Sequence, residues 1–249
     1  IACPIGINAQ EFTRAAVSES AKTMFEQVRR SLQHRALIVG VDRLDYSKGL
    51  EERFNGYARF LKDHPEHHRN VVLTQIAPPS RGEVESYQHI RATLDALAGR
   101  INGEYSDVDW SPVRYVNQGY PRDKLAGIYR AAQIGLVTPL RDGMNLVAKE
   151  YVAAQDPEDP GVLILSRFAG AATQLKDALL INPYSPEEMS DAITRALAMP
   201  LEERQRRWQS MMKCVEEQDI SWWRQCFTER LMAVQREDEE KKPQIEAAE

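Results

Sequence analysis

Residues 134–155 read IGLVTPLRDGMNLVAKEYVAAQ, and this stretch passes from one kind of regular structure to another. Ile134–Thr138 is a short apolar run, which predicts a buried strand. Asn145–Gln155 has the pattern of a helix, and the junction at 141–143 carries an arginine, an aspartate and a glycine. A strand that leads directly into a helix is the unit from which parallel α/β sheets are built. The stretch therefore predicts an α/β fold.

The same alternation of apolar runs and helical patterns covers most of the chain. The predicted strands are Ala36–Val41, Val71–Ile76, Val113–Asn117, Ile134–Thr138, Val162–Leu165 and Leu179–Ile181. The predicted helices are Glu51–Asp63, Glu83–Ala98, Arg122–Ala132, Asn145–Gln155 and Pro186–Met199. Continuous apolar strands fit burial on both faces of a sheet. We therefore expect a Rossmann-like doubly wound parallel sheet over residues 1–200.

The pattern changes after Pro200. Residues 201–236 read as two helices without a strand, and their aromatic side chains have no sheet of their own to cover. These side chains are Trp208, Trp222, Trp223 and Phe227. The last residues, 237–249, are highly charged, and we expect them to form a disordered tail.

The composition is that of an ordinary globular protein of 249 residues, with 43% hydrophobic and 28% charged residues. The net charge of −5 argues against a general nucleic-acid binder, whose affinity comes from neutralising phosphates. No apolar run approaches the roughly 20 residues that span a bilayer, so we expect no membrane partner. The chain opens on Ile1 rather than methionine, and we expect it to start inside a longer protein or to have been processed.

The cysteines are Cys3, Cys214 and Cys226, an odd number at unrelated spacings. They fit neither a disulfide framework nor a zinc pattern. Their usage favours a reducing compartment, and we expect a cytoplasmic protein.

In open α/β sheets, ligands bind at the carboxyl ends of the strands. The first such end is followed by VDRLDYSKG at 41–49, where Arg43 and Lys48 lie in one turn. A diphosphate could use both side chains, the arginine as a planar fork and the lysine as a point charge. Internal ion pairs, with Asp45 or Glu51 as partners, explain the same two cations equally well.

The second strand end is followed by TQIAPPSRGEVESY at 74–87. An arginine at a helix start, here Arg81, is unfavourable for the helix dipole unless an anion lies nearby. Arg81 is therefore a candidate anion ligand. An exposed loop arginine needs no ligand, and this alternative is favoured where no other observation is considered.

The third strand end lies in the opening stretch. A helix start offers unpaired N–H groups and a partial positive charge, which suit phosphate, and Gly143 allows close approach to the backbone. Asp142 is either a ligand contact or the helix cap. Glu150 lies eight residues later, roughly 12 Å along a helix, so the two carboxylates could bracket a nucleotide sugar. A solvated Glu150 paired with Lys149 or Arg141 is the alternative.

Two further patterns are weak. Asp107-Val108-Asp109 is a D-x-D sequence that precedes a strand, and we interpret it as a coincidence rather than a metal site. His64, His67 and His68 lie beside a proline at a helix end, where a solvated turn is the better interpretation. We therefore expect no metal site.

At the three strand ends the sequence resembles the trehalose-6-phosphate synthases, which are retaining glycosyltransferases of the two-domain GT-B kind. The matching runs are VDRLDYSKGL, TQIAPPSRG, GRINGEY, GLVTPLRDGMNLVAKEYVAAQDP, PGVLILS and FAGAA. The likeness extends from about Pro4 to about Leu231, and motifs of this length are highly specific together. The resemblance implies that the sheet domain is the C-terminal half of a GT-B fold.

The resemblance also implies roles for individual residues. Arg43 and Lys48 would bind the diphosphate of the donor UDP-glucose, Asp142 would contact the glucose hydroxyls, and Arg81 would hold the phosphate of the acceptor, glucose 6-phosphate. An aromatic residue would line the uracil pocket, a run of backbone would cradle the diphosphate and sugar, and a carboxylate would bind the ribose. In chain order the donor-binding residues would be Tyr120, Gly143, Met144, Asn145, Leu146, Val147, Ala148, Lys149 and Glu150.

The implied reaction gives trehalose 6-phosphate and UDP with retention of configuration. In the family the acceptor is thought to attack on the same face, and the leaving phosphate takes its proton. This route requires neither a protein nucleophile nor a metal or cofactor.

One departure from the family matters most. The family places a whole domain before Pro4, which supplies most acceptor contacts, and the catalytic cleft lies between the two domains. We therefore expect this chain to be the donor-binding half, inactive alone, with the missing N-terminal domain as its partner. The helices with Trp222 and Trp223 would cross toward that domain, and without it they could pair between copies as a homo-oligomer.

Three alternatives stay open from the sequence. The chain could belong to a related GT-B synthase with another phosphorylated acceptor, it could be a non-catalytic nucleotide-sugar-binding module, or its loops could be purely structural. The sequence also leaves open whether the nucleotide is UDP, ADP or GDP.

Overall fold

A computed structural model describes residues 3–79 and 85–241 of the chain. Within these residues, one parallel sheet has the strand order β3-β2-β1-β4-β5-β6. The strands are β1 (Ala36–Val41), β2 (Val71–Ile76), β3 (Val113–Val116), β4 (Ile134–Val137), β5 (Val162–Ser166) and β6 (Leu179–Ile181). This order is that of a doubly wound sheet, so the expected Rossmann-like fold is confirmed. Each predicted strand is present, and no boundary differs by more than one residue.

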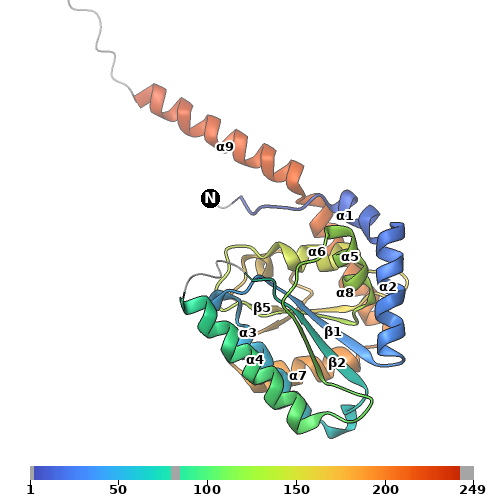
Figure 1. Cartoon of the computed structure of the whole chain (residues 1–249). Coiled ribbons are helices and arrows are strands. Elements are labelled where there is room, and N and C mark those ends of the chain that lie inside the picture. The colour runs from blue at the N-terminus through green and yellow to red at the C-terminus, as the bar shows by residue number, and fades with distance from the viewer. Residues whose placement is uncertain (1–2, 80–84, 242–249) are drawn as a thin grey trace, which may run out of the picture.

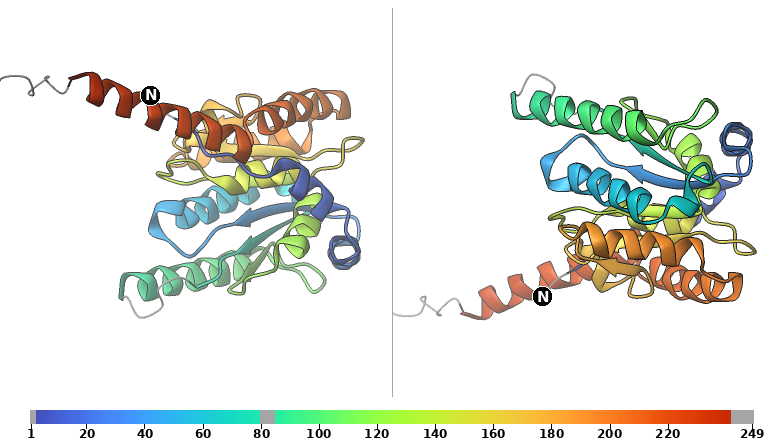
Figure 2. Two further views of the ribbon diagram at one scale, coloured as in Figure 1. Left: turned by 90° about the horizontal axis from the view of Figure 1, so that it is seen from above. Right: turned by 90° about the horizontal axis from the view of Figure 1, so that it is seen from below.

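Helices cover both faces of the sheet, as Figures 1 and 2 show. One face carries α3 (Leu50–Asp63), α4 (Glu85–Tyr105) and α7 (Pro186–Leu197). The other carries α1 (Ala9–Ala16), α2 (Glu19–Leu32), α5 (Arg122–Ala131), α6 (Leu146–Ala154) and α8 (Leu201–Glu217). The four central strands are therefore buried on both sides, in agreement with their continuous apolar sequences, whereas the edge strands β3 and β6 are partly exposed. Helix α4 continues beyond its expected end at Ala98, as far as Tyr105.

Helices α1 and α2 were not predicted from the sequence. Both begin at a residue whose side chain accepts a hydrogen bond from the first helical turn: Asn8 from the Glu11 N–H, and Ser18 from the Ala21 N–H. Phe12 of α1 is fully buried in the core. The capping residues could have indicated these two helices. They were missed because the segment precedes the first strand, and the prediction was based on the alternation of strands and helices.

Helix α8 packs on the sheet domain, whereas α9 (Ile220–Lys241) leaves it. Trp208 donates its indole N–H to the carbonyl oxygen of Val152 on α6 at 2.9 Å, and α8 buries its side chains Met211, Met212 and Val215. Helix α9 projects away from the body in all three ribbon views (Figures 1 and 2). It runs to Lys241, past the point where we expected the chain to lose regular structure.

No helix among the described residues combines the length and the hydropathy needed to cross a membrane.

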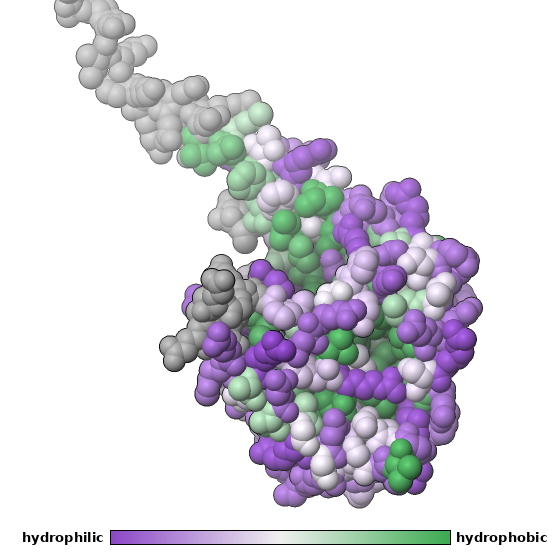
Figure 3. All heavy atoms as spheres, in the orientation of Figure 1, coloured by the Kyte–Doolittle hydropathy of each residue, from purple (hydrophilic) through white to green (hydrophobic). Residues whose placement is uncertain are grey.

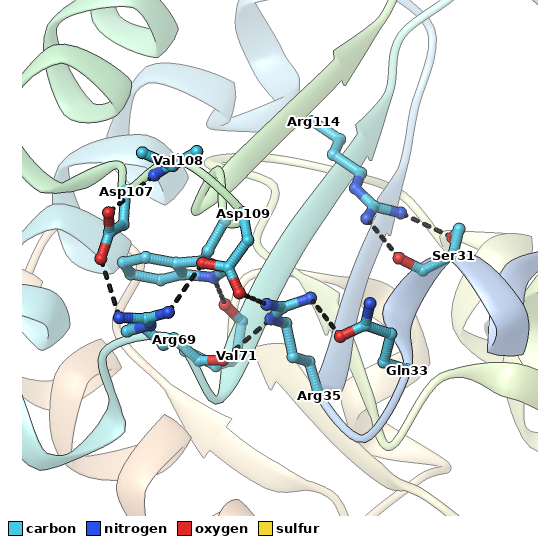
Figure 4. Close-up of polar contacts among 10 residues, drawn as sticks. Ser31, Gln33, Arg35, Arg69, Val71, Asp107, Val108, Asp109 and Arg114 are labelled. Carbon is cyan, nitrogen blue, oxygen red and sulfur yellow. Dashed lines mark hydrogen bonds and ion pairs between the residues drawn. The ribbon is translucent and has the colours of Figure 1, made fainter.

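The D-x-D sequence belongs to an ion-pair network at the amino ends of the strands (Figure 4). Asp109 accepts bonds from Arg35 at 3.1 Å and from Arg69 at 2.8 Å, and Asp107 accepts a second bond from Arg69 at 2.8 Å. Trp110 donates its indole N–H to Val71 at 2.7 Å. These carboxylates are therefore occupied in holding the loop before β3 against the starts of β1 and β2, at the end opposite to the ligand-binding edge.

The two carboxylates of this network should differ in their contribution to stability. Arg35 is buried, with 5% of its side chain exposed, so Asp109→Asn leaves a desolvated guanidinium without its carboxylate. We expect the free energy of unfolding in urea to fall by about 1–2 kcal/mol. Asp107 pairs only with the exposed Arg69, and Asp107→Asn should cost less than about 0.5 kcal/mol. Equal losses in the two variants would contradict this ranking.

Candidate functional site

Two loops meet beyond the carboxyl ends of the two central strands. β1 and β4 are neighbours in the sheet, but β1 leads to α3 and β4 leads to α6, which lie on opposite faces. When two neighbouring strands are followed by connections to opposite faces of the sheet, a crevice remains beyond the strand ends. Doubly wound sheets bind ligands in this crevice. We call residues 42–49 the first loop and residues 138–145 the second loop.

Backbone contacts hold the two loops against each other. The carbonyl oxygen of Ser47 accepts hydrogen bonds from the N–H groups of Leu140 at 2.8 Å and Arg141 at 3.3 Å. Gly49 ends the first loop with φ of +63°, and a Cβ at this position would lie 2.2 Å from the carbonyl oxygen of Thr138. Only glycine combines this left-handed conformation with such a close approach.

The closest charged contact of the site joins Lys48 to Asp142. Lys48 Nζ lies 2.6 Å from Asp142 Oδ2, and only 18% and 15% of the two side chains are exposed. Asp142 also accepts bonds from the Met144 N–H at 3.3 Å and from the Asn145 side chain at 3.2 Å. The two residues that the sequence singled out at separate strand ends therefore form one ion pair across the crevice.

This ion pair decides between two sequence-based alternatives. Lys48 pairs with Asp142 rather than with Glu51. The cap of α6 is Asn145, which has φ of +74° and accepts a hydrogen bond from the Ala148 N–H at 3.1 Å. Asp142 therefore lies before the cap, where its carboxylate faces the first loop instead of closing the helix.

At this edge, a positive charge has no ion-pair partner among the described residues. Arg43 is exposed and has no ion pair within residues 3–79 and 85–241. The N–H groups of Leu146 and Val147, in the first turn of α6, have no acceptor within the helix. Gly143 is exposed, and a Cβ there would contact nothing within 4 Å, so the backbone at this point is open to solvent. An arginine in one loop and a helix start after the other can together bind an anion in the crevice between the loops.

Backbone hydrogen bonds from the segment after β5 hold the second loop in position. Gly170 donates its N–H to the Asp142 carbonyl oxygen at 3.0 Å, and Ala171 donates to that of Met144 at 2.8 Å. Asp142 in turn donates its N–H to the carbonyl oxygen of Phe168 at 3.3 Å. The FAGAA sequence therefore positions the backbone from Asp142 to Met144.

The remaining expected donor residues lie along α6 and beside it. Glu150 is half-buried, and burial raises the pKa of its carboxyl group while the charge of Arg122 works against that rise. Tyr120 lies after β3 and packs half-buried against the core. Ala148 is fully buried. Lys149 is also buried and donates from Nζ to the Ile5 carbonyl oxygen at 2.8 Å, so its side chain is occupied within the chain.

A buried polar cluster that the sequence analysis missed lies beneath the two loops. Arg53, from α3, donates Nη1 to Asp42 Oδ2 and to Gln75 Oε1, both at 2.7 Å, and Nε to Thr138 Oγ1 at 2.9 Å. Arg53 is fully buried, and Asp42 is nearly so. Burial raises the pKa of Asp42, and the guanidinium of Arg53 counteracts this rise.

A signal for this cluster existed in the sequence. Arg53 occupies the apolar face of its helix, three residues after Leu50 and four before Tyr57, where a charged residue must find a buried partner. Asp42 directly follows an apolar strand.

Two other expectations fall elsewhere. Arg81 lies outside the described residues. His64 and His67 pack around Phe60, with ring centroids 5.6 Å and 5.3 Å from that of the phenylalanine, and His68 packs on Trp110. Among the described residues no group of three metal-ligating side chains comes together.

The fold and the crevice define the chain as a doubly wound α/β domain with a polar crevice at the carboxyl ends of its central strands. A family model for glycosyltransferase family 20 matches residues 1–233, and the chain belongs to that family. It is 53% identical to a trehalose-6-phosphate synthase from an Enterobacter species over 90% of this chain and 47% of the relative.

Solved structures give the same result. A UDP-forming α,α-trehalose-phosphate synthase from Burkholderia xenovorans in complex with glucose-6-phosphate is 48% identical, with a TM-score of 0.90, over 92% of this chain and 51% of that one. A structure from E. coli bound with UDP-2-fluoro glucose is 49% identical, with a TM-score of 0.88, over 91% and 50%. The chain spans about half the length of these relatives and matches their C-terminal half, so the expected GT-B half-fold is confirmed.

The buried Arg53–Asp42 pair should contribute strongly to stability. Arg53→Met leaves Asp42 buried without a partner, and we expect the free energy of unfolding to fall by about 3–5 kcal/mol. Arg59→Met, on the exposed face of the same helix, should cost less than about 1 kcal/mol. The double variant Arg53→Met, Asp42→Leu removes both charges and should recover much of the loss. A single Arg53→Met variant as stable as Arg59→Met would contradict this account.

The stability of the chain should increase in alkaline solution because of Lys149. Burial lowers the pKa of Lys149 from 10.5 to about 8, so the unfolded chain binds more protons than the folded chain between these values. Stability therefore rises with pH in this window. We expect the wild type to gain about 1–3 kcal/mol relative to Lys149→Met between pH 7 and pH 10, measured by urea unfolding. A stability difference that does not change with pH would show that Lys149 is neutral or equally charged in both states.

Proposed function

We propose that this chain is the donor-binding half of a UDP-forming trehalose-phosphate synthase. The whole protein would transfer glucose from UDP-glucose to glucose 6-phosphate, with retention, and release UDP. The observation that carries the proposal is the crevice between the two loops, where the Lys48–Asp142 pair connects the loop of Arg43 to the loop that leads into α6. The relatives bound with glucose-6-phosphate and UDP-2-fluoro glucose support the choice of ligands.

The charges of the crevice suit the departure of a diphosphate. As the glycosidic bond of UDP-glucose breaks, negative charge develops on the leaving UDP and positive charge on the sugar. Arg43, Lys48 and the first N–H groups of α6 would stabilise the diphosphate, and the ion pair of Lys48 and the backbone contacts of the second loop hold part of this arrangement in place before reaction. Asp142 would accept hydrogen bonds from glucose hydroxyls on the side of the developing oxocarbenium ion.

A ligand in this crevice would exchange partners with the existing ion pair. Lys48 Nζ and Asp142 Oδ2 lie 2.6 Å apart. A diphosphate would draw Lys48 toward itself, and the sugar hydroxyls would then donate to the carboxylate of Asp142. The pair would thus keep both side chains oriented toward the crevice until the donor arrives.

The remaining donor contacts follow the order of the elements. The half-buried Glu150 on α6 would bind the ribose hydroxyls, and Tyr120 after β3 would flank the uracil. The backbone of 143–146 would lie along the diphosphate and the sugar. The buried Lys149 would contribute through its backbone, since its ammonium group is bonded to Ile5.

The acceptor side depends on residues beyond this half. Arg81 would hold the phosphate of glucose 6-phosphate, and further contacts would come from an N-terminal domain. We therefore propose that the chain alone binds the donor and is inactive in a coupled assay for trehalose 6-phosphate. The location would be cytoplasmic, as the cysteine usage favours.

Binding of UDP by the chain tests the proposal. In calorimetric titrations we expect UDP to bind in preference to ADP and GDP, and Arg43→Ala to weaken UDP binding by about 10- to 100-fold, because a charge-assisted contact to the diphosphate is lost. The same variant should bind uridine as the wild type does, since uridine has no phosphate.

A matched variant separates a local effect from one of net charge. Arg29→Ala removes an exposed arginine at the opposite edge of the sheet and should leave UDP affinity unchanged. The absence of saturable UDP binding by the folded wild-type chain, or an equal loss for UDP and uridine in Arg43→Ala, would contradict the proposed diphosphate site.

A further inference from the structure

The first described residue of the chain lies against the C-terminal helix. The sulfur atoms of Cys3 and Cys226 are 2.8 Å apart, although the two residues are separated by 223 positions in the sequence. Both thiols are free and half-buried. Cys214, on α8, is also free, but its thiol is paired with neither of them. The spacings of the cysteines in the sequence argued against a disulfide, but the fold brings two of the three thiols together.

Backbone contacts fix the segment before α1 against the start of α9. The N–H of Ile220 donates to the carbonyl oxygen of Ile7 at 3.0 Å. A Cβ at Gly6 would lie 2.3 Å from the carbonyl carbon of Asp219, so only glycine allows the two segments of the chain to approach this closely. Lys149 anchors the same segment from α6 through Ile5. The position of Cys3 thus follows from several independent contacts.

The geometry along the two segments is consistent with the thiol contact. Cys226 lies six residues after Ile220, which is about 9 Å along an α-helix. Cys3 lies four residues before Ile7, and an extended chain covers about 13 Å over that length. The segment therefore reaches from its anchor at the start of α9 to Cys226 without strain on the anchor.

Beyond this contact α9 has few partners in the chain. About half of each side chain is exposed at Phe227, Leu231, Met232 and Val234, with values of 51–55%. Figure 3 shows hydrophobic residues on the surface where α9 leaves the body. The thiol pair is therefore the outermost cross-connection between α9 and the rest of the described chain.

We propose that Cys3 and Cys226 are a modification site, at which a low-molecular-weight disulfide such as oxidised glutathione converts the two thiols into a reversible intrachain disulfide. One cysteine thiolate attacks the small disulfide, forms a mixed disulfide and releases one small thiol. The second cysteine then displaces the other small thiol. The two cysteine protons end on the two released thiols, and the small disulfide is the species that is reduced.

The environment of the thiols is compatible with this exchange. A disulfide bond is about 2.0 Å long, so the 2.8 Å separation of the sulfur atoms would have to shorten by about 0.8 Å. The pKa of Cys3 is raised, chiefly by the hydrogen bond with Cys226 and by burial, and the charge of Arg230, one helical turn after Cys226, limits this rise, so the exchange should be faster at alkaline pH. Half-exposure leaves both sulfur atoms within reach of a small reagent.

The bond would hold α9 to the segment that leads into α1. It would close a loop that contains nearly the whole chain, and such a cross-link stabilises by restricting the unfolded state. In a longer protein it would also fix the direction in which α9 leaves the domain. Reduction would release that direction again.

The experiment is a thiol count after treatment with oxidised glutathione. We expect the folded wild-type chain to fall from three reactive thiols to one, and a non-reducing tryptic digest to contain one cross-linked species that joins the peptides of Cys3 and Cys226. The Tm should rise by about 5–10 °C, and dithiothreitol should restore all three thiols and the original Tm.

Variants locate the effect. Cys214→Ser should form the same cross-link and show the same rise in Tm. Cys3→Ser and Cys226→Ser should show neither. Three persistent thiols in the wild type, a stable glutathione adduct, a cross-link that includes Cys214, or a disulfide-linked dimer on a non-reducing gel would each overturn the proposal.

Discussion

The buried pairing of Arg53 with Asp42 is the contact on which the ligand-binding edge depends. Its guanidinium joins α3 to the ends of three strands, through Asp42 after β1, Gln75 in β2 and Thr138 after β4. A buried ion pair of this kind adds little net stability compared with apolar packing, but it penalises any arrangement that leaves one partner unpaired. The two loops are therefore fixed at their roots, and their exposed residues can be selected for ligand contacts.

At the exposed part of the same edge, in contrast, the charges are only partly balanced by ion pairs. Lys48 and Asp142 neutralise each other at the surface of the crevice, whereas Arg43 has no ion pair in residues 3–79 and 85–241 and the start of α6 carries the partial positive charge of a helix N-terminus. In a chain with a net charge of −5, this local excess is not a property of the composition. It arises because two loops that are far apart in the sequence are brought together by the strand order, with β1 beside β4.

The sequence predicted the sheet well and the contacts within the edge less well. Apolar runs flanked by helices determine where strands occur, because burial on both faces requires such runs, and all six were placed correctly. Side-chain pairing depends on which strand ends become neighbours, and so Lys48–Asp142 and the Arg53 cluster could not be read from local spacing. Helices α1 and α2 were missed although their caps are ordinary, since they precede the first strand. The D-x-D sequence was interpreted as a coincidence, and the participation of its carboxylates in the network with Arg35 and Arg69 required the tertiary structure.

The hydrogen bond from Lys149 to Ile5 connects α6, the helix proposed to bind the donor, to the segment before α1. Lys149 stands on α6 next to Glu150, and its ammonium group is bonded to the segment that also carries the backbone contact with α9. A displacement of that segment must either move α6 or break a hydrogen bond from a buried cation, which is costly. Coupling of this kind is reciprocal: any motion of the segment that changes ligand affinity at the start of α6 will itself be favoured or opposed by ligand to the same extent. Occupancy of the crevice would thereby be coupled to the position of the segment before α1 and, through its backbone contact at Ile220, to the start of α9.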